Sequence, residues 1–169
     1  MSLNLTLAQA EDEPFLFEVY ASSRAYEMSL VPWDEAQKIA FLKMQFAAQL
    51  NHYRSFYRGA QHQIIHLDDQ PIGRIYVANL EEEIRILDVT ILPQHRGKGI
   101  GTELILSTVE EGRKCGKPVS IYVENFNPSQ KLFTRLGFSK VSEHGINILF
   151  AWHADASAIV EDKYSGSAV

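Results

Sequence analysis

The spacing of hydrophobic and polar residues changes along the chain, and each change marks an element. Residues 3–7 alternate between apolar and polar side chains, which predicts a first strand. An acidic turn at residues 11–13 precedes Pro14, and proline is favoured at the first position of a helix. Apolar residues then keep helical spacing to about Ser23, so the first strand is expected to lead into a helix.

Pro32 interrupts this pattern, and Asp34 is well placed to cap a second helix that ends near Tyr57. We expect one apolar stripe along this helix to face the core. The stripe consists of Ile39, Leu42, Phe46 and Leu50. Aromatic residues at the end of this helix, Tyr53, Phe56 and Tyr57, also have core spacing, although the aromatic and basic residues from His52 to Arg58 could instead receive an acidic or aromatic acceptor.

The remainder of the chain alternates strands with shorter helices. Strands are predicted at 63–67, 72–80 and 83–92, with turns at 68–71 and 81–82. A helix follows through Cys115, where Gly116 and Pro118 end it. A strand at 119–123, a short helix at 128–136 and a strand pair at 138–152 complete the order, with the last turn at residues 144–145.

Composition narrows the class of protein. The 169 residues are 46% hydrophobic and 22% charged, which is typical of a globular protein with one domain, expected at 1–153 before a polar tail at 154–169. The net charge of −5 argues against general binding of nucleic acid or anionic membranes. One cysteine excludes an internal disulfide, and the histidines have no metal-ligand spacing, so no metal is expected. No segment has the length of a membrane span, which predicts a cytoplasmic protein; a homodimer is left open.

Candidate chemistry is concentrated in the segment QHRGKGIGT, residues 94–102, between a predicted strand and a predicted helix. Unpaired N–H groups at a helix N-terminus bind anions, and glycines let a phosphate approach the backbone. Arg96 and Lys98 add positive charge, unless they are only solvated surface residues. A P-loop is excluded because Gly99 follows Lys98, and a dinucleotide fingerprint is excluded because Thr102 replaces its third glycine.

The spacing that does match is Q-x-x-G-x-G, formed by Gln94, Gly97 and Gly99. It resembles the pyrophosphate loop of the GNAT superfamily of acyl-CoA N-acyltransferases. The downstream segment NPSQKLFTRLGF, residues 127–138, resembles that family's second signature. The two signatures together cover about residues 83–138.

The resemblance implies a fold, a cofactor and an activity. The fold is α/β, with a mixed, mostly antiparallel twisted sheet of about seven strands, about four flanking helices and a cleft between splayed strands. The co-substrate is acetyl-CoA, and the reaction is direct acetyl transfer to a primary amine of a small molecule, an amino acid or a protein. The implied cofactor-binding residues are Val89, Thr90, Ile91, Gln94, Arg96, Gly97, Lys98, Gly99, Ile100, Gly101, Thr102, Asn127 and Phe133.

Two carboxylates are candidates for the general base that accepts a proton from the ammonium acceptor. Glu83 starts the predicted strand, and Asp88 lies among apolar residues of the same strand, where an unpaired carboxylate is costly. Asp88 must therefore face the cleft or be hydrogen-bonded for a structural reason. Either carboxylate is open to both a catalytic and a structural role.

Phe133 departs from the family pattern. The family's tyrosine at this position protonates the leaving thiolate, and a phenyl ring has no proton to give. The acid is then water or another group such as Tyr122, or the thiolate leaves directly. Asn127 is open to two roles, a cofactor contact or a helix cap. The alternative to an enzyme is a CoA-binding regulatory or scaffold protein with little or no catalysis.

Overall fold

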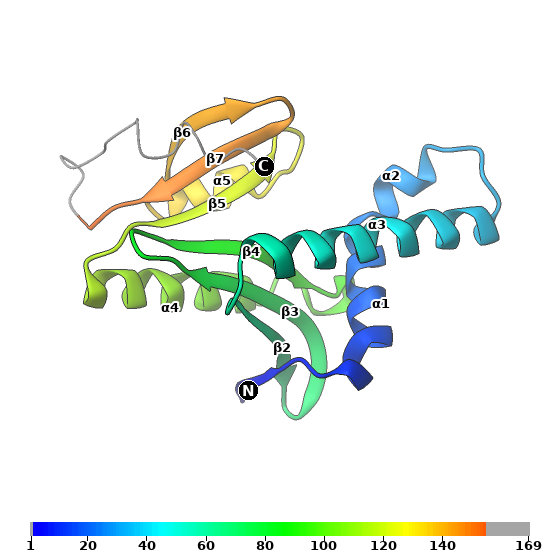
Figure 1. Cartoon of the computed structure of the whole chain (residues 1–169), viewed down its shortest axis with the longest axis horizontal. Helices are drawn as coiled ribbons and strands as arrows, with labels where there is room; N and C mark the ends of the chain where they lie inside the picture. The colour runs from blue at the N-terminus through cyan, green and yellow to red at the C-terminus, as the bar shows by residue number, and fades with distance from the viewer. Residues whose placement is uncertain (1, 155–169) are drawn as a thin grey trace. The chain divides into compact units, whose positions relative to one another are not determined.

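The structure is a computed structural model that describes residues 2–154 (Figure 1). The helices are α1 (Glu13–Ser23), α2 (Ala25–Ser29), α3 (Glu35–Phe56), α4 (Ile100–Cys115) and α5 (Gln130–Arg135). The strands are β1 (Leu3–Leu7), β2 (Gln61–Leu67), β3 (Gln70–Asn79), β4 (Ile84–Ile91), β5 (Val119–Glu124), β6 (Ser139–His144) and β7 (Asn147–Trp152). Two short 3-10 turns, η1 (Ala10–Asp12) and η2 (Pro93–His95), complete the elements.

The seven strands form one sheet in the order β1-β2-β3-β4-β5-β7-β6. β4 and β5 run parallel, whereas β1 with β2, β5 with β7 and β6 with β7 run antiparallel. Short turns join β2 to β3 and β3 to β4, which makes these neighbours antiparallel as well. The prediction of a mixed, mostly antiparallel α/β sheet is confirmed.

By contacts, the described chain forms two compact units that share β3 and β4. The first contains residues up to Tyr76 together with Asp88–Lys98, and the second contains Val77–Leu87 and the residues from Gly99 onward. The expectation of one domain at 1–153 stays a prediction. Residues 155–169 of the expected tail lie outside the described part. Among residues 2–154, no helix is both long and apolar enough to cross a membrane.

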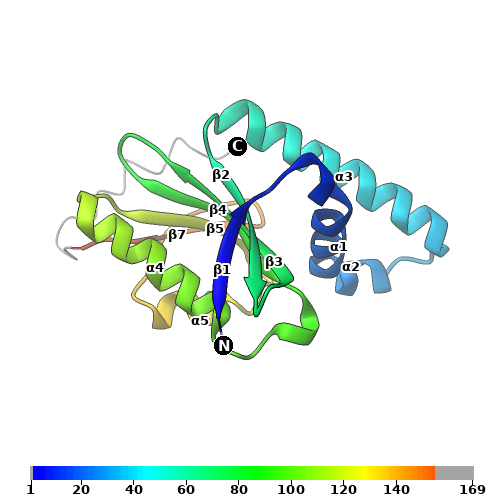
Figure 2. The ribbon, with the colours of Figure 1, turned by 90° about the horizontal axis from the view of Figure 1, so that it is seen from below.

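In the first unit, α3 begins where the sequence predicts. The Asp34 carboxylate accepts a hydrogen bond from the Gln37 N–H at 2.8 Å, and the Gln37 side chain accepts one from the Asp34 N–H at 3.0 Å. This reciprocal cap satisfies two amide donors at the helix start. Figure 2 shows α3 beside α1, and the Phe46 ring lies 5.4 Å from that of Tyr20 between centroids.

Two predicted core residues of α3 are exposed. Leu42, Phe46 and Leu50 are buried as expected, but 45% of Ile39 and 63% of Phe56 is exposed, so both core assignments are wrong. α3 has 22 residues and α1 has 11, so at about 33 and 16 Å in length α1 is too short to cover the whole of α3.

A separate helix, α2, was not predicted from the sequence. Arg24 ends α1 with φ −108° and ψ 3°, and only five residues follow before the next break. None of these residues is buried, so α2 leaves no apolar stripe for periodicity to detect. The sheet therefore has five accompanying helices instead of about four.

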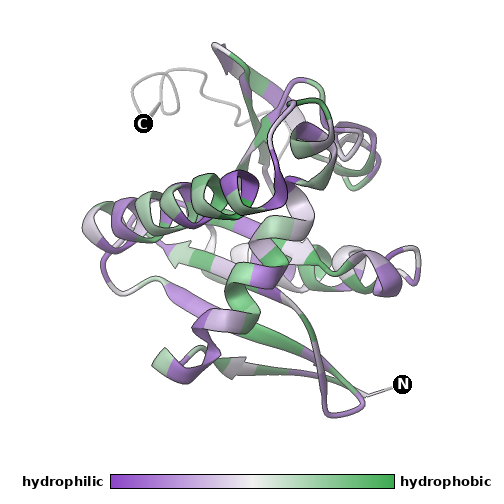
Figure 3. Cartoon of the chain, turned by 90° about the vertical axis from the view of Figure 1, so that its right-hand side faces the viewer, coloured by the Kyte–Doolittle hydropathy of each residue, from purple (hydrophilic) through white to green (hydrophobic). Residues whose placement is uncertain are grey.

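In the second unit, α4 buries Leu104, Ile105 and Val109, and Gly116 ends the helix in the left-handed conformation with φ +68°. The β6–β7 hairpin turns at the predicted position, after His144. β7 is buried along most of its length and pairs with both β5 and β6. Figure 3 shows green and purple segments alternating along the helices, so apolar and polar residues are interspersed in them.

Candidate functional site

The predicted phosphate loop connects η2 to α4. Its backbone is left-handed at Gly97 and Gly99, with φ +78° and +79°, a conformation that residues with a Cβ atom rarely adopt. A Cβ atom placed on Gly97, Gly99 or Gly101 meets no atom of residues 2–154 within 4 Å. No side chain caps α4, and its first residue, Ile100, is 4% exposed and anchors the helix start. The loop therefore presents uncapped backbone N–H groups next to open space.

The two loop cations differ in their contacts. Arg96 donates a hydrogen bond from Nε to the carbonyl oxygen of Ile91 at 2.7 Å, which ties the loop to the end of β4. This bond occupies one of the backbone groups expected to bind the pantetheine. Both Arg96 and Lys98 are exposed, as are Gln94, Gly97 and Gly99. The loop therefore carries two cations at its surface.

The end of β4 is half-buried and lies close to β3. Val89, Thr90 and Ile91 are each partly exposed, in contrast to the buried residues at the start of the strand. A Cβ atom on Gly73 of β3 would lie 2.2 Å from the carbonyl oxygen of Thr90. Only glycine fits there without displacing the strand, so Gly73 fixes the close approach of the two backbones.

Asp88 is not an isolated carboxylate. Its Oδ2 atom accepts a hydrogen bond from Nε of Arg74 at 2.7 Å, and the Thr90 hydroxyl donates to it at 3.0 Å. Nη2 of Arg74 donates to the Gln49 side-chain oxygen of α3 at 2.6 Å, and the guanidinium lies 5.9 Å from the centre of the Phe46 ring. The side chain of Arg74 is 1% exposed, whereas that of Asp88 is 25% exposed. Asp88 is thus hydrogen-bonded within the protein, which is one of the two arrangements expected from the sequence.

Three further side chains surround this pair. Tyr53 of α3 lies 5.2 Å from Tyr76 of β3, and His62 of β2 stacks on Tyr76 at 4.2 Å. Burial raises the pKa of the Tyr53 and Tyr76 hydroxyls. Burial also lowers the pKa of His62 to about 4, with the positive charge of Arg74 acting in the same direction. We call Gln49, Tyr53, His62, Arg74, Tyr76 and Asp88 the Arg74 cluster.

The other candidate base, Glu83, belongs to a polar group in the second unit. Its Oε1 atom lies 2.8 Å from Nη2 of Arg85 and accepts a hydrogen bond from the Ser120 hydroxyl at 2.6 Å. Nε of Arg85 donates to the Ser120 oxygen at 3.1 Å, and the guanidinium lies over the Tyr122 ring. Only 12% of the Glu83 side chain is exposed. Glu83 is therefore held by two buried partners.

Asn127 and Phe133 have structural contacts of their own. The Asn127 side-chain oxygen accepts a hydrogen bond from the Ser129 N–H at 2.9 Å, and α5 begins at Gln130 instead of Pro128. Asn127 thus shapes the turn before the helix. Phe133 is 3% exposed, and its ring lies 5.4 Å from that of Phe138 and 6.4 Å from that of Phe150. A ligand contact by either residue stays a prediction.

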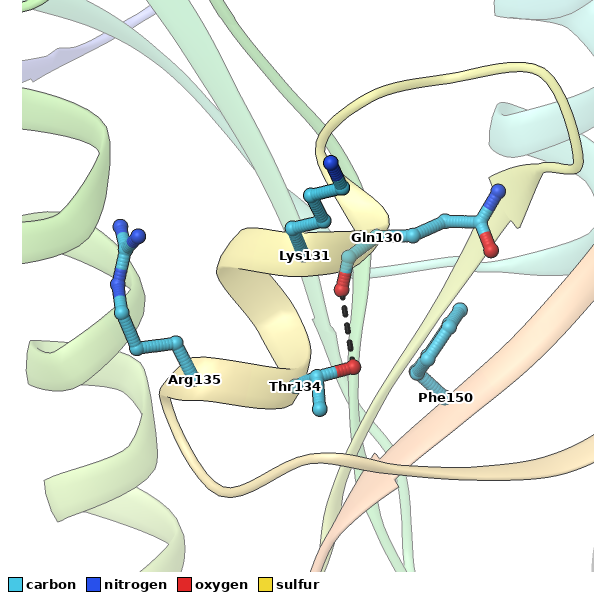
Figure 4. Close-up of a pocket in the computed structure, with 5 residues that line it drawn as sticks. All are labelled: Gln130, Lys131, Thr134, Arg135 and Phe150. Carbon is cyan, nitrogen blue, oxygen red and sulfur yellow. Dashed lines mark hydrogen bonds between the residues drawn. The ribbon is translucent and has the colours of Figure 1, made fainter.

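A surface pocket of about 480 Å³ lies beside α5 (Figure 4). Five residues line it, namely Gln130, Lys131, Thr134, Arg135 and Phe150. The hydroxyl of Thr134 donates a hydrogen bond to the Gln130 carbonyl oxygen at 3.0 Å, so this polar group is satisfied within the helix. Lys131 and Arg135, four residues apart, make the pocket basic.

The structure thus brings some predicted residues together and separates others by unit. Asp88, Thr90 and the residues to Lys98 belong to the first unit, while Glu83, Gly99 and the later cofactor candidates belong to the second. Arg74 was missed from the sequence. Its signal was present, because a charged residue within the apolar run 72–77 requires a buried partner, as Asp88 does.

Comparison with known proteins agrees with this arrangement. Residues 18–138 match the model of the acetyltransferase (GNAT) family. No curated protein is similar enough in sequence to count as a relative.

Several solved structures share the fold. PaiA N-acetyltransferase from Thermoplasma acidophilum, in complex with coenzyme A, has a TM-score of 0.69 and 18% identity over 90% of this chain and 99% of its own. An acetyltransferase from Thermus thermophilus has a TM-score of 0.64 and 19% identity, over 90% and 97%. The ribosomal-protein-S18-alanine N-acetyltransferase from Escherichia coli has a TM-score of 0.62 and 13% identity, over 94% and 99%.

Proposed function

This chain belongs to the acetyltransferase (GNAT) family, and from that premise we propose that it transfers an acetyl group from acetyl-CoA to a primary amine. Family membership confirms the resemblance inferred from the two sequence signatures and places the chain among the acyl-CoA-dependent acyltransferases. The proposal adds the acyl group, the amine acceptor and a direct transfer in a ternary complex.

The observation that carries the proposal is the loop before α4. Its two left-handed glycines and uncapped helix start present backbone N–H groups to open space, with Arg96 and Lys98 beside them. Such a site suits the pyrophosphate of coenzyme A. The Thermoplasma structure with the same fold contains coenzyme A, which supports this choice of ligand.

The end of β4 is the expected binding edge for the pantetheine. Val89, Thr90 and Ile91 are partly exposed, and a strand backbone binds amides as it would bind another strand. In this chain, the Ile91 carbonyl already accepts a hydrogen bond from Arg96. The N–H and C=O groups of Val89 are therefore the better candidates, because the Thr90 carbonyl faces Gly73 of β3.

Acetyl-CoA supplies the thioester, and the protein has to supply a proton acceptor for the amine. Asp88 is better suited than Glu83, because twice as much of its side chain is exposed, 25% against 12%. Within the described part of the chain, its Oδ1 atom accepts a single hydrogen bond, from the Thr90 hydroxyl at 3.2 Å. We assign Asp88 the role of taking the proton from the ammonium, either directly or through water. The neutral amine then forms the bond to the acetyl carbon as the carbon–sulfur bond breaks.

Phe133 favours a second candidate function, a CoA-binding protein with little or no catalysis. This residue stands where the family has a tyrosine, and its buried ring packs against Phe138 and Phe150. Tyr122 has a hydroxyl that could protonate the thiolate, and it is partly exposed. An enzyme with this sequence must therefore release the thiolate without a proton from a tyrosine at residue 133.

A thiol-release assay with acetyl-CoA and a panel of primary amines tests the two functions. An enzyme releases coenzyme A only when an acceptor is present, and Asp88→Asn reduces kcat more than it weakens acetyl-CoA binding. Glu83→Gln is the matched control, since it removes the other candidate base. Tight binding of CoA without turnover on any acceptor would support the scaffold protein and overturn the enzyme.

A further inference from the structure

Arg74 is a buried cation with one nitrogen atom unsatisfied. Its side chain is 1% exposed, and Asp88 and Gln49 accept hydrogen bonds from Nε and Nη2. Among the residues that the structure describes, none accepts a hydrogen bond from Nη1. Leaving a charged donor buried without an acceptor costs free energy, so an acceptor is expected from outside residues 2–154.

A second unsatisfied atom belongs to the same cluster. Nε2 of His62 is buried and has no hydrogen-bond partner among the described residues. The imidazole is neutral near pH 7, because burial and the charges of Arg74 and Arg54 lower its pKa to about 4. The cluster therefore offers a cationic donor, a neutral imidazole nitrogen and, through Asp88, one carboxylate.

We propose that the Arg74 cluster is the acceptor-binding site and selects small amines that also carry a carboxylate, of which α-amino acids are the simplest. The acceptor carboxylate binds Nη1 of Arg74, and the acceptor ammonium binds Asp88. This inference rests on the proposed acetyl transfer and adds its acceptor class.

Charge balance supports this class over a purely cationic acceptor. Arg74 and Asp88 cancel each other in a pair joined at 2.7 Å, so the pair has no net charge to offset a diamine. An amino acid carries both charges and is itself neutral, so it matches each member of the pair with its opposite. The positive charges of Arg74 and Arg54 near His62 also oppose the binding of a second ammonium.

The location fits the proposed reaction. Asp88 accepts a hydrogen bond from the hydroxyl of Thr90, which belongs to the end of β4 proposed for the pantetheine. It is also the most exposed member of the ion pair, so the pair meets the surface there. An ammonium at Asp88 would lose one proton to that carboxylate. The resulting neutral amine would then attack the thioester carbon, and its second proton would pass to the thiolate released as the carbon–sulfur bond breaks.

The test compares acceptors that differ only in the carboxylate. Thiol release from acetyl-CoA is measured with a set of α-amino acids, with the corresponding amino acid amides and with 1,4-diaminobutane. We expect kcat/KM to be about 10-fold to 100-fold higher for an amino acid than for its amide, as a charged hydrogen bond would give. Equal rates for acid and amide, or a preference for the diamine, would overturn the inference and leave the acetyltransferase proposal intact.

Variants separate recognition from folding. Arg74→Lys keeps a cation beside Asp88 but cannot satisfy the contacts of three guanidinium nitrogens, so we expect it to raise KM for amino acids and to leave acetyl-CoA affinity unchanged. Arg113 belongs to an exposed ion pair of α4, so Arg113→Gln is the control for removing an arginine. It should change neither the KM for amino acids nor the affinity for acetyl-CoA.

Calorimetry with the CoA-bound protein covers the case in which no amine is acetylated. Amino acid binding that Arg74→Lys weakens would support the site although the acetyltransferase proposal had failed. The absence of amino acid binding to the CoA-bound wild-type protein would overturn the inference.

Discussion

The unequal burial of Arg74 and Asp88 predicts that removing one charge of the pair lowers the free energy of unfolding more than removing the other. Arg74 is enclosed, with 1% of its side chain exposed, whereas 25% of the Asp88 side chain reaches the surface. Replacing Arg74 with methionine leaves a carboxylate that water can solvate. Replacing Asp88 with asparagine leaves a guanidinium charge on a side chain that is 1% exposed, where solvation is poor. We therefore expect Asp88→Asn to lower the free energy of unfolding more than Arg74→Met.

The sizes follow from burial. Removing one partner of a buried ion pair costs about 3–5 kcal/mol. We expect about 4 kcal/mol for Asp88→Asn and about 2 kcal/mol for Arg74→Met, since water and the Thr90 hydroxyl still solvate the remaining carboxylate. The double variant leaves no charge in the cluster, so its loss should be smaller than the sum of the two single losses.

Urea unfolding followed by tryptophan fluorescence measures these free energies, and Trp33 belongs to the same unit as the pair. The exposed pair Glu110–Arg113 is the matched control, with about half of each side chain exposed, and Glu110→Gln should cost less than about 1 kcal/mol. Equal losses from the two single variants, or strict additivity in the double variant, would refute the argument from unequal burial.

Three further changes test other parts of the structure. Gly73→Ala should lower stability by about 2–3 kcal/mol, because its Cβ atom would lie 2.2 Å from the Thr90 carbonyl oxygen; an unchanged melting temperature by calorimetry would contradict that contact. The pKa of His62 falls from 6.5 to about 4 on folding. The free energy of unfolding should therefore be unaffected by His62 above pH 6.5 and should fall by about 2–3 kcal/mol as the pH is lowered towards 4, because the unfolded chain then binds a proton that the folded protein does not. Urea unfolding at stepped pH should show a shallower decline in His62→Gln than in wild type, and identical slopes would count against a buried neutral imidazole. Ser120→Ala should cost about 1–3 kcal/mol in the same urea assay, because the fully buried hydroxyl both donates to Glu83 and accepts from an arginine, and no loss would mean that this network has little energetic weight.

The sequence predicted the individual strands and the loop because both leave local signals, whereas the arrangement of the sheet came from the family resemblance. Alternating residues mark β1, and the Asp34 cap marks the start of α3, so these elements are found where expected. The positive φ angles at Gly97 and Gly99 agree with the glycine spacing from which the anion loop was inferred. Such features depend on neighbouring residues only, and a single sequence therefore contains them.

The features that the sequence did not predict depend on contacts between residues far apart in the chain. Ile39 has the spacing of a core residue but is 45% exposed, because burial depends on which distant elements reach a side chain and not on its spacing alone. Arg74 acquires its role from Gln49 and Asp88, which lie 25 and 14 positions away in the chain. The apolar run around Arg74 indicated that it needs a partner, but spacing alone could not identify one. Sequence reasoning therefore found single members of the candidate acceptor site, Asp88 and the region of Tyr53, but not their assembly around Arg74, whereas it found the candidate cofactor loop as a whole.

The central claim is that the glycine loop before α4 binds the pyrophosphate of acetyl-CoA. Isothermal titration of acetyl-CoA into wild-type protein and into Gly99→Glu tests it most directly, with Glu103→Gln as a control for a charge change in the first turn of the same helix. A glutamate at residue 99 introduces negative charge into the anion site and strains a backbone with φ +79°. We predict saturable binding to wild type and to the control and a loss of at least about 10-fold in affinity for Gly99→Glu. Equal affinity of the wild type and Gly99→Glu would contradict the claim.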